Sequence, residues 1–578
     1  MPRVPRLVCA VLAAALVAAG CAPAPSRDWP QEPAQEAQPG RHHMVAAANP
    51  LAAEAGRDIL RRGGSAVDAA IAMQMVLNLV EPQSSGIGGG GFLLHYDAES
   101  GEVAAYDGRE TAPAGATAGM FLRPNGTPKG FFEAAVGGGG VGVPGLLRML
   151  ETAHARHGRL AWADLFTPAI RLAEDGFGVS PRLHELIARD RHLKTFPATA
   201  AYFYRADGRP RDAGEILVNR PLARTLGAIA KGGADAFYRG AIARDIVSAV
   251  RRATANPGVM SEQDLAGYGA KARRAICRPY RVWRVCGMPP PSSGGVATLQ
   301  ALGILEAFEL SALKPGSAAA VHLVSEASRL AFADRNRYLG DPDFVAVPVA
   351  ALLDPAYLSR RAALISPRQT MGRALPGAVA GGDVPPPAQA PAHDPASTTH
   401  ISVIDGAGNA VAFTSSIENV FGSRVMVRGF LLNNQLTDFS FRPEVDGRPV
   451  ANRPAPGKRP LSSMSPTLVF DGQHRLVMTL GSPGGQRIIG YVLKTLVATL
   501  DWGLELQQAI DLPNHVNRNG PTEIEAETPL AGVERALEAM GHEVEVRELG
   551  SGLHGVMVTG SGLAGGADSR REGAALGD

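Results

Sequence analysis

A stretch rich in Pro, Ala and Gly over residues 372–396 runs directly into a strand-like sequence that begins at Thr398. The first composition is typical of a linker, and the Thr, Ile and Val residues over 398–404 are typical of a buried strand. If the chain were cut before Thr398, that residue would hold both a hydroxyl nucleophile and a free α-amine, which titrates near ~8 and can accept the hydroxyl proton. The junction therefore indicates a self-cleaving hydrolase, against the alternative that a Thr pair simply begins a strand.

The first twenty residues form a targeting segment and are excluded from the fold. Two arginines precede an apolar run over residues 7–19, which is shorter than the ~20 residues of a membrane-spanning helix. Small residues then precede Cys21, an arrangement that resembles a bacterial lipoprotein signal, in which this Cys becomes the lipidated first residue. We therefore expect a signal peptide over 1–20, a lipid on Cys21, a Pro-rich tether over 21–40 and a periplasmic or cell-envelope location. Ordinary export with cleavage nearby is the alternative and would leave the protein secreted.

The charge balance argues against nucleic-acid binding. Without the two signal arginines the number of Lys and Arg residues falls from 57 to 55, which equals the 55 Asp and Glu residues. A nucleic-acid-binding surface needs a basic excess and basic clusters. We expect no nucleic-acid partner, and no membrane contact other than the lipid.

Of the four cysteines, we expect Cys9 to leave with the signal and Cys21 to be the lipid acceptor. The remaining two, Cys277 and Cys286, predict one disulfide in an exported protein. The residues between them read as strand, turn and strand, which sets the two cysteines opposite one another. Zinc is the weaker alternative because no second Cys pair or His pair with ligand spacing accompanies them, and we expect neither a metal nor a cofactor.

Helix signals dominate the chain before the junction. Asn49 and Ser65 are predicted to cap two successive helices, and residues 144–365 are mainly helical apart from one strand pair near 270–288. Between these regions, the Gly-rich run over 86–91 matches G-x-G-x-x-G. Because a helix precedes it and a strand follows it, close backbone packing is favoured over a dinucleotide site.

After the junction the pattern changes to strands. We expect them over 401–404, 410–416, 426–432, 467–470 and 475–479, with one helix over 488–499. The separation of helical and strand-rich regions favours an α+β fold with helical layers around antiparallel sheets, rather than alternating βαβ units.

Three segments after the junction combine polar side chains with exposed backbone groups: 433–438, 460–466 and 481–485. The first ends in a carboxylate that could hold a substrate ammonium, and the second supplies two serine hydroxyls. The third carries a glycine pair whose N–H groups suit an oxyanion hole. Upstream, Arg109 offers a fork of donors to a substrate carboxylate.

Together these segments resemble the γ-glutamyltranspeptidase family, in the same order and spacing and over nearly the whole chain. The matching motifs are Thr398-Thr399-His400, Asn433-Asn434-Gln435 and the segments 460–466, 481–485, 86–92, 141–145 and 288–295. The resemblance implies the N-terminal nucleophile hydrolase fold, an αββα sandwich of two antiparallel sheets between helical layers. It also implies a precursor that cuts itself into a large subunit over 41–397, which includes the linker over 372–397, and a small catalytic subunit over 398–578. The two chains would stay together and transfer the γ-glutamyl group of glutathione and related amides to water or to amino acids.

The resemblance assigns a role to each candidate residue. Thr398 matches the nucleophile, and Ser416 matches a second hydroxyl residue that hydrogen-bonds the nucleophile region. The other matched positions are Arg109, Ser462 and Ser463 at the substrate α-carboxylate, Gln435, Asp438 and Glu418 at its α-amine, and Gly484 and Gly485 at the oxyanion hole.

Three alternatives compete with this interpretation. Relatives of the same fold act on glutaryl or cephalosporin-type side chains, but the pair of Arg109 and Asp438 favours a substrate with both a carboxylate and an ammonium. The S-x-x-K match at Ser311 has no S-D-N or K-T-G partner, which argues against a serine acyl-enzyme of the penicillin-binding class. A non-enzymatic envelope lipoprotein would need neither Thr398 nor Arg109.

The stretch over 439–459 is short and rich in Pro, Gly and charge, with Phe439 and Phe441 at its start and no Tyr or Trp. Many members of the resembled family carry an aromatic lid in this place. Without one, water reaches an acyl-enzyme more easily. We therefore expect an open site in which hydrolysis competes with transfer and which admits poly-γ-glutamate; a different covering loop is the alternative.

Overall fold

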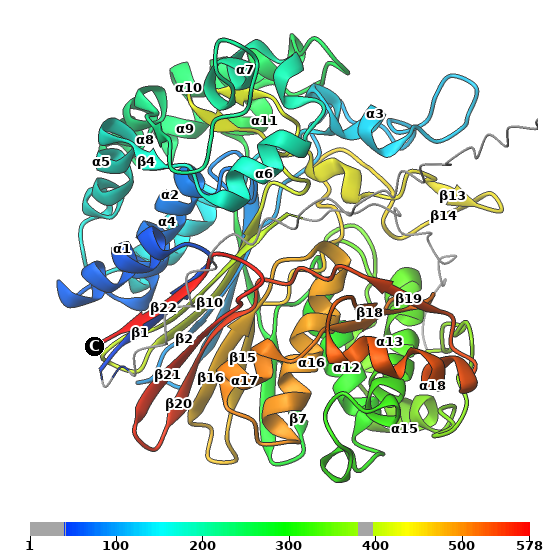
Figure 1. Cartoon of the computed structure of the whole chain (residues 1–578). Coiled ribbons are helices and arrows are strands. Elements are labelled where there is room, and N and C mark those ends of the chain that lie inside the picture. Colours follow the sequence, from blue (N-terminus) through cyan, green and yellow to red (C-terminus); the bar gives the residue numbers. More distant parts are fainter. Residues whose placement is uncertain (1–39, 41, 380–396) are drawn as a thin grey trace, which may run out of the picture. The chain divides into compact units, whose positions relative to one another are not determined.

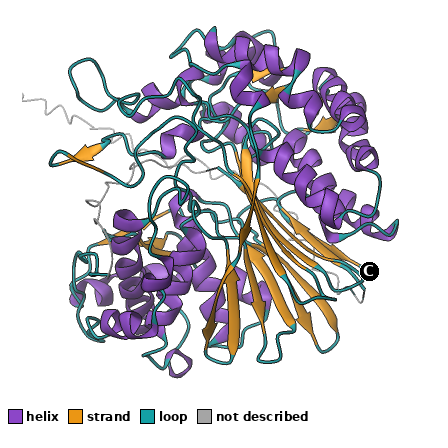
Figure 2. Cartoon of the chain, turned by 180° about the vertical axis from the view of Figure 1, so that it is seen from behind, coloured by secondary structure: helices purple, strands orange, loops and turns teal. Residues whose placement is uncertain are grey.

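Two antiparallel sheets pack against each other at the centre of the molecule, and helices lie on their outer faces (Figures 1 and 2). The computed structural model describes residues 40, 42–379 and 397–578. This arrangement is the αββα sandwich expected from the sequence. The signal segment, Cys21, the tether before Gly40 and residues 380–396 of the linker lie outside the described residues.

The first sheet has seven strands and takes them from both sides of the Ser397–Thr398 junction. Their order is β22 (Ala574–Gly577), β1 (Met44–Ala47), β9 (Thr399–Ile404), β10 (Ala410–Ser416), β2 (Gly90–Tyr96), β3 (Val103–Gly108) and β6 (Lys271–Arg274). β9 begins one residue after Thr398 and pairs with β1 on one side and β10 on the other. The junction therefore leads into an interior strand, as its apolar sequence predicts.

The second sheet has six strands. Their order is β21 (Gly562–Ala567), β20 (His554–Thr559), β16 (Leu476–Gly481), β15 (Thr467–Phe470), β8 (Trp283–Gly287) and β7 (Ile276–Tyr280). Successive side chains of a strand point to opposite faces: Val411 and Phe413 of β10 pack towards the first helical layer, and Ala410 and Ala412 pack towards the second sheet. Burial on both faces explains why residues 410–413 of β10 are all apolar.

Each sheet carries one helical layer. The first layer contains α1 (Pro50–Arg61), α2 (Ala66–Val80), α4 (Leu146–His157), α5 (Thr167–Asp175), α6 (Pro181–Arg189), α7 (Pro197–Phe203), α8 (Arg220–Gly232), α9 (Asp235–Tyr238), α10 (Gly240–Arg251) and α11 (Glu262–Ala266). The second contains α12 (Gly294–Leu305), α13 (Ala318–Tyr338), α14 (Val349–Leu352), α15 (Pro355–Ala362), α16 (Ile488–Leu500) and α17 (Leu506–Asp511). Two short helices, α3 (Phe131–Ala135) and α18 (Glu534–Ala539), contribute to separate small clusters. Asn49 and Ser65 cap α1 and α2 as predicted.

The expected strand over 426–432 is wrong. The structure has instead a tight hairpin of β11 (Met426–Val427) and β12 (Phe430–Leu431). Arg428 and Gly429 at its turn have φ values of 47° and 90°, and two successive positive values are what a two-residue hairpin turn requires. The remaining short pairings are β4 (Phe177–Gly178) with β5 (Ile216–Leu217), β13 (Glu444–Val445) with β14 (Arg448–Pro449), and β17 (His515–Asn517) with β18 (Thr522–Glu525) and β19 (Val544–Arg547).

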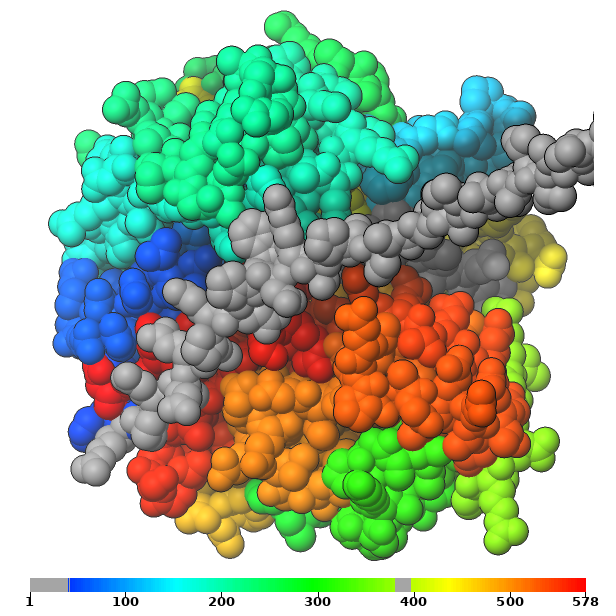
Figure 3. All heavy atoms as spheres, in the orientation of Figure 1, coloured from blue at the N-terminus to red at the C-terminus, as the bar shows by residue number. Residues whose placement is uncertain are grey.

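The expected separation of helices and strands along the chain was too simple. β1, β2, β3 and β6 precede the junction and lie in the same sheet as β9 and β10. In Figure 3, residues that follow the junction, coloured orange and red, lie between the blue-to-teal residues above them and green residues below them. The two segments are therefore interleaved, which explains how two chains cut at residue 397 could stay together.

Two local expectations from the sequence, the disulfide and the close backbone packing of the Gly-rich run, are confirmed. Cys277 and Cys286 form a disulfide between β7 and β8, where they are direct partners with Cα atoms 4.0 Å apart. In the Gly-rich run, a Cβ on Gly88 or Gly89 would lie 2.1 Å from a carbonyl oxygen of β12 or β10. Backbone packing is the reason for these glycines, as the sequence predicts. Among the described helices, none is long and apolar enough to cross a membrane.

Candidate active site

Thr398 lies at the head of β9, beside the end of β10, and its side chain is buried. Its Oγ1 lies 3.0 Å from Oγ of Ser416, the last residue of β10. Ser416 Oγ in turn accepts a hydrogen bond of 2.9 Å from the amide of Glu418. The hydrogen bond expected between the two hydroxyls is therefore present, and the Glu418 amide holds the Ser416 hydroxyl in place.

The Thr398 backbone in the uncut chain is held through both its amide and its carbonyl. The Thr398 amide donates to the Ser84 carbonyl at 3.2 Å, and the Thr398 carbonyl accepts from Arg571 Nη1 at 3.1 Å. Thr398 has a φ of +104°, a region that β-branched residues rarely occupy. Such a conformation costs roughly 1–3 kcal/mol and clusters at functional sites. Cleavage of the 397–398 bond would remove this torsional constraint.

Arg109 and Asp438 form an ion pair beside the nucleophile. Arg109 directly follows β3 and is almost completely buried, and its Nη2 lies 2.5 Å from Asp438 Oδ2. The guanidinium also donates to the carbonyls of Pro460 and Leu461, at 3.1 and 2.9 Å. Three acceptors fix the fork, and the partly exposed Asp438 compensates its buried charge. The pair presents one positive and one negative group to a ligand.

Two further polar side chains lie on the Asp438 side of this pair. Gln435 Nε2 donates to Asp438 Oδ2 at 2.7 Å, within the one-turn helix η5 (Gln435–Asp438). Glu418 accepts a hydrogen bond from the Asn434 amide group. Burial, and then the neighbouring Asp438 carboxylate, raise the pKa of Glu418 to about 8.

Arg335, on α13, is a buried cation that the sequence analysis missed. Its Nη2 donates to Ser463 Oγ at 2.9 Å, and its Nε donates to Ser293 Oγ at 2.8 Å. No carboxylate of a described residue lies within ion-pair distance of it, and burial lowers its pKa to about 10. Because Ser463 Oγ accepts from Arg335, its own hydrogen is directed elsewhere and is available to a ligand carboxylate.

The glycine pair follows β16. Gly484 and Gly485 have φ values of 133° and 57°, and a Cβ on Gly484 would lie 2.6 Å from the Tyr491 ring. Within the described part of the chain neither amide donates a hydrogen bond. Two unpaired N–H groups near Thr398 are the material of an oxyanion hole.

One pocket brings most of these groups together. Seven of the expected residues line it, namely Thr398, Ser416, Gly485, Arg109, Glu418, Asp438 and Ser463. Three others adjoin it through a bonded neighbour: Gln435 through Asp438, Ser462 through Ser463, and Gly484 through Gly485. No Cys or His is among the described residues that line the pocket, and its groups suit acyl transfer at a hydroxyl.

Residue Asn452 also lines the pocket and was missed in the sequence. Its Nδ2 donates to the Asp438 carbonyl at 2.7 Å, and its Oδ1 accepts from the Leu461 amide at 2.9 Å. Asn452 therefore connects segment 433–438 to segment 460–466, which contains Ser462 and Ser463. A lone Asn in a Pro- and Gly-rich loop carries no sequence signal, whereas Arg335 could have been suspected as a charged residue within a largely buried helix.

No aromatic residue lines the pocket in the described part of the chain. Phe439 is buried in a small cluster with Phe121, and Phe441 stacks on Phe121 with ring centroids 4.6 Å apart. Ser440, between the two phenylalanines, and Asn452, after the β13–β14 hairpin, line the pocket. The hairpin itself projects to the right of the sheets in Figure 1. The aromatic side chains of this loop therefore serve packing.

The model of the family described as Gamma-glutamyltranspeptidase matches residues 52–578. The chain is 39% identical over 549 residues to a glutathione hydrolase proenzyme of Bacillus subtilis (strain 168), with 93% of this chain and 92% of that protein covered. It is 38% identical over 513 residues to the acylase ACY 1 proenzyme of Pseudomonas sp. (strain SE83), with 87% and 88% covered.

Among solved structures, the cephalosporin acylase from Bacillus halodurans has a TM-score of 0.82 with this structure at 28% sequence identity. The match covers 96% of this chain and 99% of that one. The chain is thus similar both to a protein named glutathione hydrolase and to proteins named acylases.

Proposed function

Because the chain belongs to the γ-glutamyltranspeptidase family, we propose that it is a self-cleaving γ-glutamyltransferase and glutathione hydrolase. It takes the γ-glutamyl group of glutathione and related amides and passes it to water or to an amino acid or peptide. One observation carries the proposal: a single pocket holds the Thr398 hydroxyl and, beside it, the Arg109–Asp438 pair. No cofactor enters the chemistry.

The γ-glutamyl group carries an ammonium and a carboxylate on one carbon, and its reactive carbonyl lies beyond two methylene groups. Arg109 and Ser463 would bind the carboxylate, because both present donors to the pocket. Asp438, with Gln435 and Glu418 beside it, would bind the ammonium. This double recognition places the γ-carbonyl at the Thr398 hydroxyl.

Maturation and catalysis use the same oxygen atom. In maturation, Thr398 Oγ1 adds to the Ser397 carbonyl carbon, the C–N bond breaks, and the released α-amine carries the hydroxyl proton. Water then hydrolyses the resulting ester. This gives chains that end at Ser397 and begin at Thr398, the second with 181 residues (578 − 397). The strained φ of Thr398 favours the first step, because the strain ends with the bond.

In catalysis, Oγ1 adds to the substrate γ-carbonyl carbon while the α-amine takes its proton. The Gly484 and Gly485 amides stabilise the oxyanion. The amine then returns the proton to the leaving amine. The ester reacts with water to give glutamate, or with an amino group to give a new γ-glutamyl amide.

The test is the release of cysteinylglycine and glutamate from glutathione by the purified protein, with and without an acceptor dipeptide. We expect both hydrolysis and transfer in the wild type and neither in Thr398→Ala. A glutaryl amide, which lacks the α-ammonium, is the competing substrate, since the chain also resembles proteins named acylases. Faster cleavage of the glutaryl amide than of glutathione would contradict the proposal.

Two finer parts of the proposal concern location and access. A lipid on Cys21 would tether the protein to an envelope membrane, as the small residues before this Cys suggest. The absence of an aromatic side chain among the described pocket-lining residues supports a site open to water and to longer γ-linked chains such as poly-γ-glutamate.

A further inference from the structure

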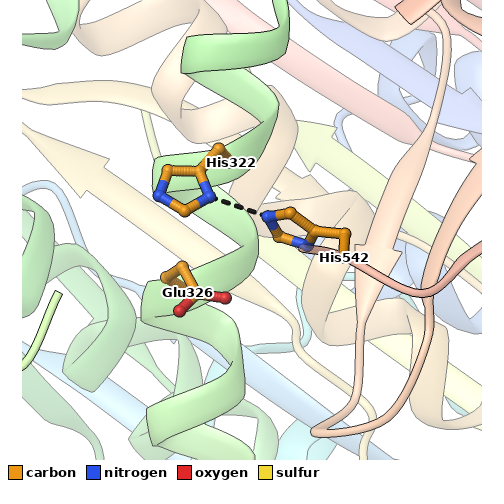
Figure 4. Close-up of side chains that lie close together, drawn as sticks. All are labelled: His322, Glu326 and His542. Carbon is orange, nitrogen blue, oxygen red and sulfur yellow. Dashed lines mark hydrogen bonds between the residues drawn. The ribbon is translucent and has the colours of Figure 1, made fainter. Parts of the chain in front are cut away.

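A second cluster of polar side chains lies apart from the pocket, where α13 meets the turn after α18 (Figure 4). His322 and Glu326 are one helical turn apart on α13, and His542 follows α18. All three are buried, and one ligand atom of each lies within 4.8 Å of the others. No local sequence pattern marks this group, because 220 residues separate the two histidines.

Both imidazoles are oriented by oxygen atoms on their outer side. His322 Nε2 lies 2.7 Å from the Ser366 carbonyl, which can only accept, so Nε2 carries the hydrogen and Nδ1 keeps its lone pair. His542 Nδ1 lies 2.8 Å from Thr522 Oγ1. The inner nitrogens, His322 Nδ1 and His542 Nε2, consequently face each other at 2.7 Å. Metal-bound histidines are held in the same way, by an oxygen on the ring nitrogen that does not bind the metal.

Glu326 completes the group with a carboxylate oxygen. Its Oε1 accepts from Arg329 Nε and Thr370 Oγ1, whereas Oε2 accepts one hydrogen bond, from the Met371 amide. A carboxylate oxygen can accept two, so Oε2 has a lone pair left. Figure 4 shows the carboxylate on the same side of α13 as the His322 ring and below His542.

We propose that His322, Glu326 and His542 form a binding site for a divalent transition metal ion of the zinc type. Two imidazoles and one carboxylate are a ligand set that zinc accepts, and a fourth position is left for water. On binding, the hydrogen of His542 moves from Nε2 to Nδ1, and Nδ1–H then donates a hydrogen bond to Thr522 Oγ1. His542 Nε2 is thereby free to bind the metal. No net proton is released, and the metal takes the place of the hydrogen bond between the rings.

Two structural features set how well the ion binds. Ligand bonds of about 2.0–2.1 Å at tetrahedral angles place the two nitrogens about 3.3 Å apart, so the rings must separate slightly from their present 2.7 Å. Arg329 forms an ion pair with Glu326 and opposes the charge of the ion. We therefore expect weaker binding than at sites with more anionic ligands, and a protein that also folds without the metal.

The position of the site gives the ion a role. His322 and Glu326 precede the proposed cut at residue 397, and His542 follows it. Glu326 and His322 also hold the segment around Ser366, Thr370 and Met371, near the end of the described part of the large chain. A bound ion would join the two chains after cleavage. This role rests on the proposed function, whereas metal binding itself does not.

The experiment measures metal uptake by the purified protein after treatment with a chelator and dialysis against Zn²⁺ or Co²⁺. We expect about one ion per protein molecule, whether the molecule is cut or uncut. With Co²⁺ we expect the visible absorption of a low-coordinate site. His542→Gln keeps a hydrogen-bond donor to His322 but removes the ligand, and should bind at least about ten-fold more weakly. His474→Gln, at an exposed turn, is the matched control and should bind as the wild type does.

Thr398→Ala separates this proposal from the previous one, because the cluster is complete in the uncut chain. That variant should bind metal as tightly as the wild type while it fails to cut or to hydrolyse glutathione. His542→Gln should still hydrolyse glutathione, and added Zn²⁺ should raise the thermal midpoint of the wild type but not of this variant. No uptake by the wild type, or equal uptake by wild type and His542→Gln, would overturn the site.

Discussion

Arg109→Ala should weaken catalysis only for substrates that carry the α-carboxylate. In the structure, Arg109 Nε and Nη2 are occupied by the Pro460 and Leu461 carbonyls and by Asp438. Nη1 has no hydrogen-bond acceptor among the described residues, and it lies 3.8 Å from a Glu110 oxygen. Nη1 is therefore the donor left for a substrate.

The size of the effect follows from the contact that is lost. A hydrogen bond to a charged group contributes about 1.5–3 kcal/mol, and each 1.4 kcal/mol is a factor of about ten. We expect kcat/KM for γ-glutamyl-p-nitroanilide to fall about ten- to 150-fold, mostly through KM. For the 4-aminobutyryl analogue, which lacks only the α-carboxylate, the fall should be small.

Asp438→Asn provides the crossed control. It removes the anion for the ammonium, so it should affect the γ-glutamyl and 4-aminobutyryl substrates and spare the glutaryl analogue, which lacks the ammonium. Arg109→Lys keeps the positive charge but loses the planar set of guanidinium donors. Its kcat/KM for the γ-glutamyl substrate should lie between those of the wild type and Arg109→Ala. The assay is steady-state release of p-nitroaniline from the three substrates by all four proteins.

Equal losses of kcat/KM for all three substrates in Arg109→Ala would refute this reasoning and leave Arg109 with a structural role. Such a role is a real competitor, because Glu110 is buried, makes no hydrogen bond through its carboxylate, and lies next to this guanidinium. Burial raises the pKa of Glu110 to about 8, so it can stay neutral when Arg109 is removed. Complete chain cleavage and an unchanged thermal midpoint would show that the variant is folded.

Thr398→Ala should remain one band on a denaturing gel, whereas Thr398→Ser keeps a hydroxyl and should still yield the 181-residue chain (578 − 397); cleavage of the Ala variant at this bond would contradict the mechanism. Cys21→Ser should move the protein from the membrane fraction to the soluble fraction, and unchanged partitioning would favour ordinary export. Since burial raises the pKa of Glu418 to about 8, its carboxylate becomes charged as the pH rises through that value and should then bind the substrate ammonium better. KM for glutathione should accordingly fall between neutral pH and about 8.5 in the wild type but not in Glu418→Gln; parallel pH profiles would exclude Glu418 from the ammonium site. A γ-linked glutamate oligomer should be hydrolysed alongside glutathione if the site is open, and no cleavage of the oligomer, with transfer dominant at millimolar acceptor, would contradict this.

Part of the site has a local signal in the sequence, whereas Ser416 and Glu418 were assigned only through the family resemblance. Thr398 follows a linker and precedes an apolar strand, and Gly484 and Gly485 follow another strand as a pair. Asp438 ends the polar segment 433–438, which directly follows the apolar residues 430–432. Each signal arises because a special backbone position or a change of burial requires a particular residue type within a few positions.

Asn452 and the His322–His542 pair could not be found in this way, and for Arg335 the only local signal is a charge within a largely buried helix. Arg335 reaches Ser463 across 128 positions, and His322 reaches His542 across 220. Such contacts depend on how α13 packs against segments of the small chain, and no local pattern records that packing. The β11–β12 hairpin was missed for a different reason: an Arg-Gly pair is a weaker turn signal than Asn-Gly or Asp-Gly.

The uncut structure also indicates how the Thr398 amine becomes a base. Its nitrogen already donates to the Ser84 carbonyl, and its carbonyl is held by Arg571. After cleavage the nitrogen is a primary amine with two hydrogens and one lone pair. If one hydrogen keeps the bond to Ser84, the amine is held against rotation, while the Thr398 Oγ1 position stays fixed by Ser416. The contacts that hold the precursor peptide would then place the free amine beside the same hydroxyl, so that cutting the bond converts a strained residue into an ordered nucleophile and base without any rearrangement of β9.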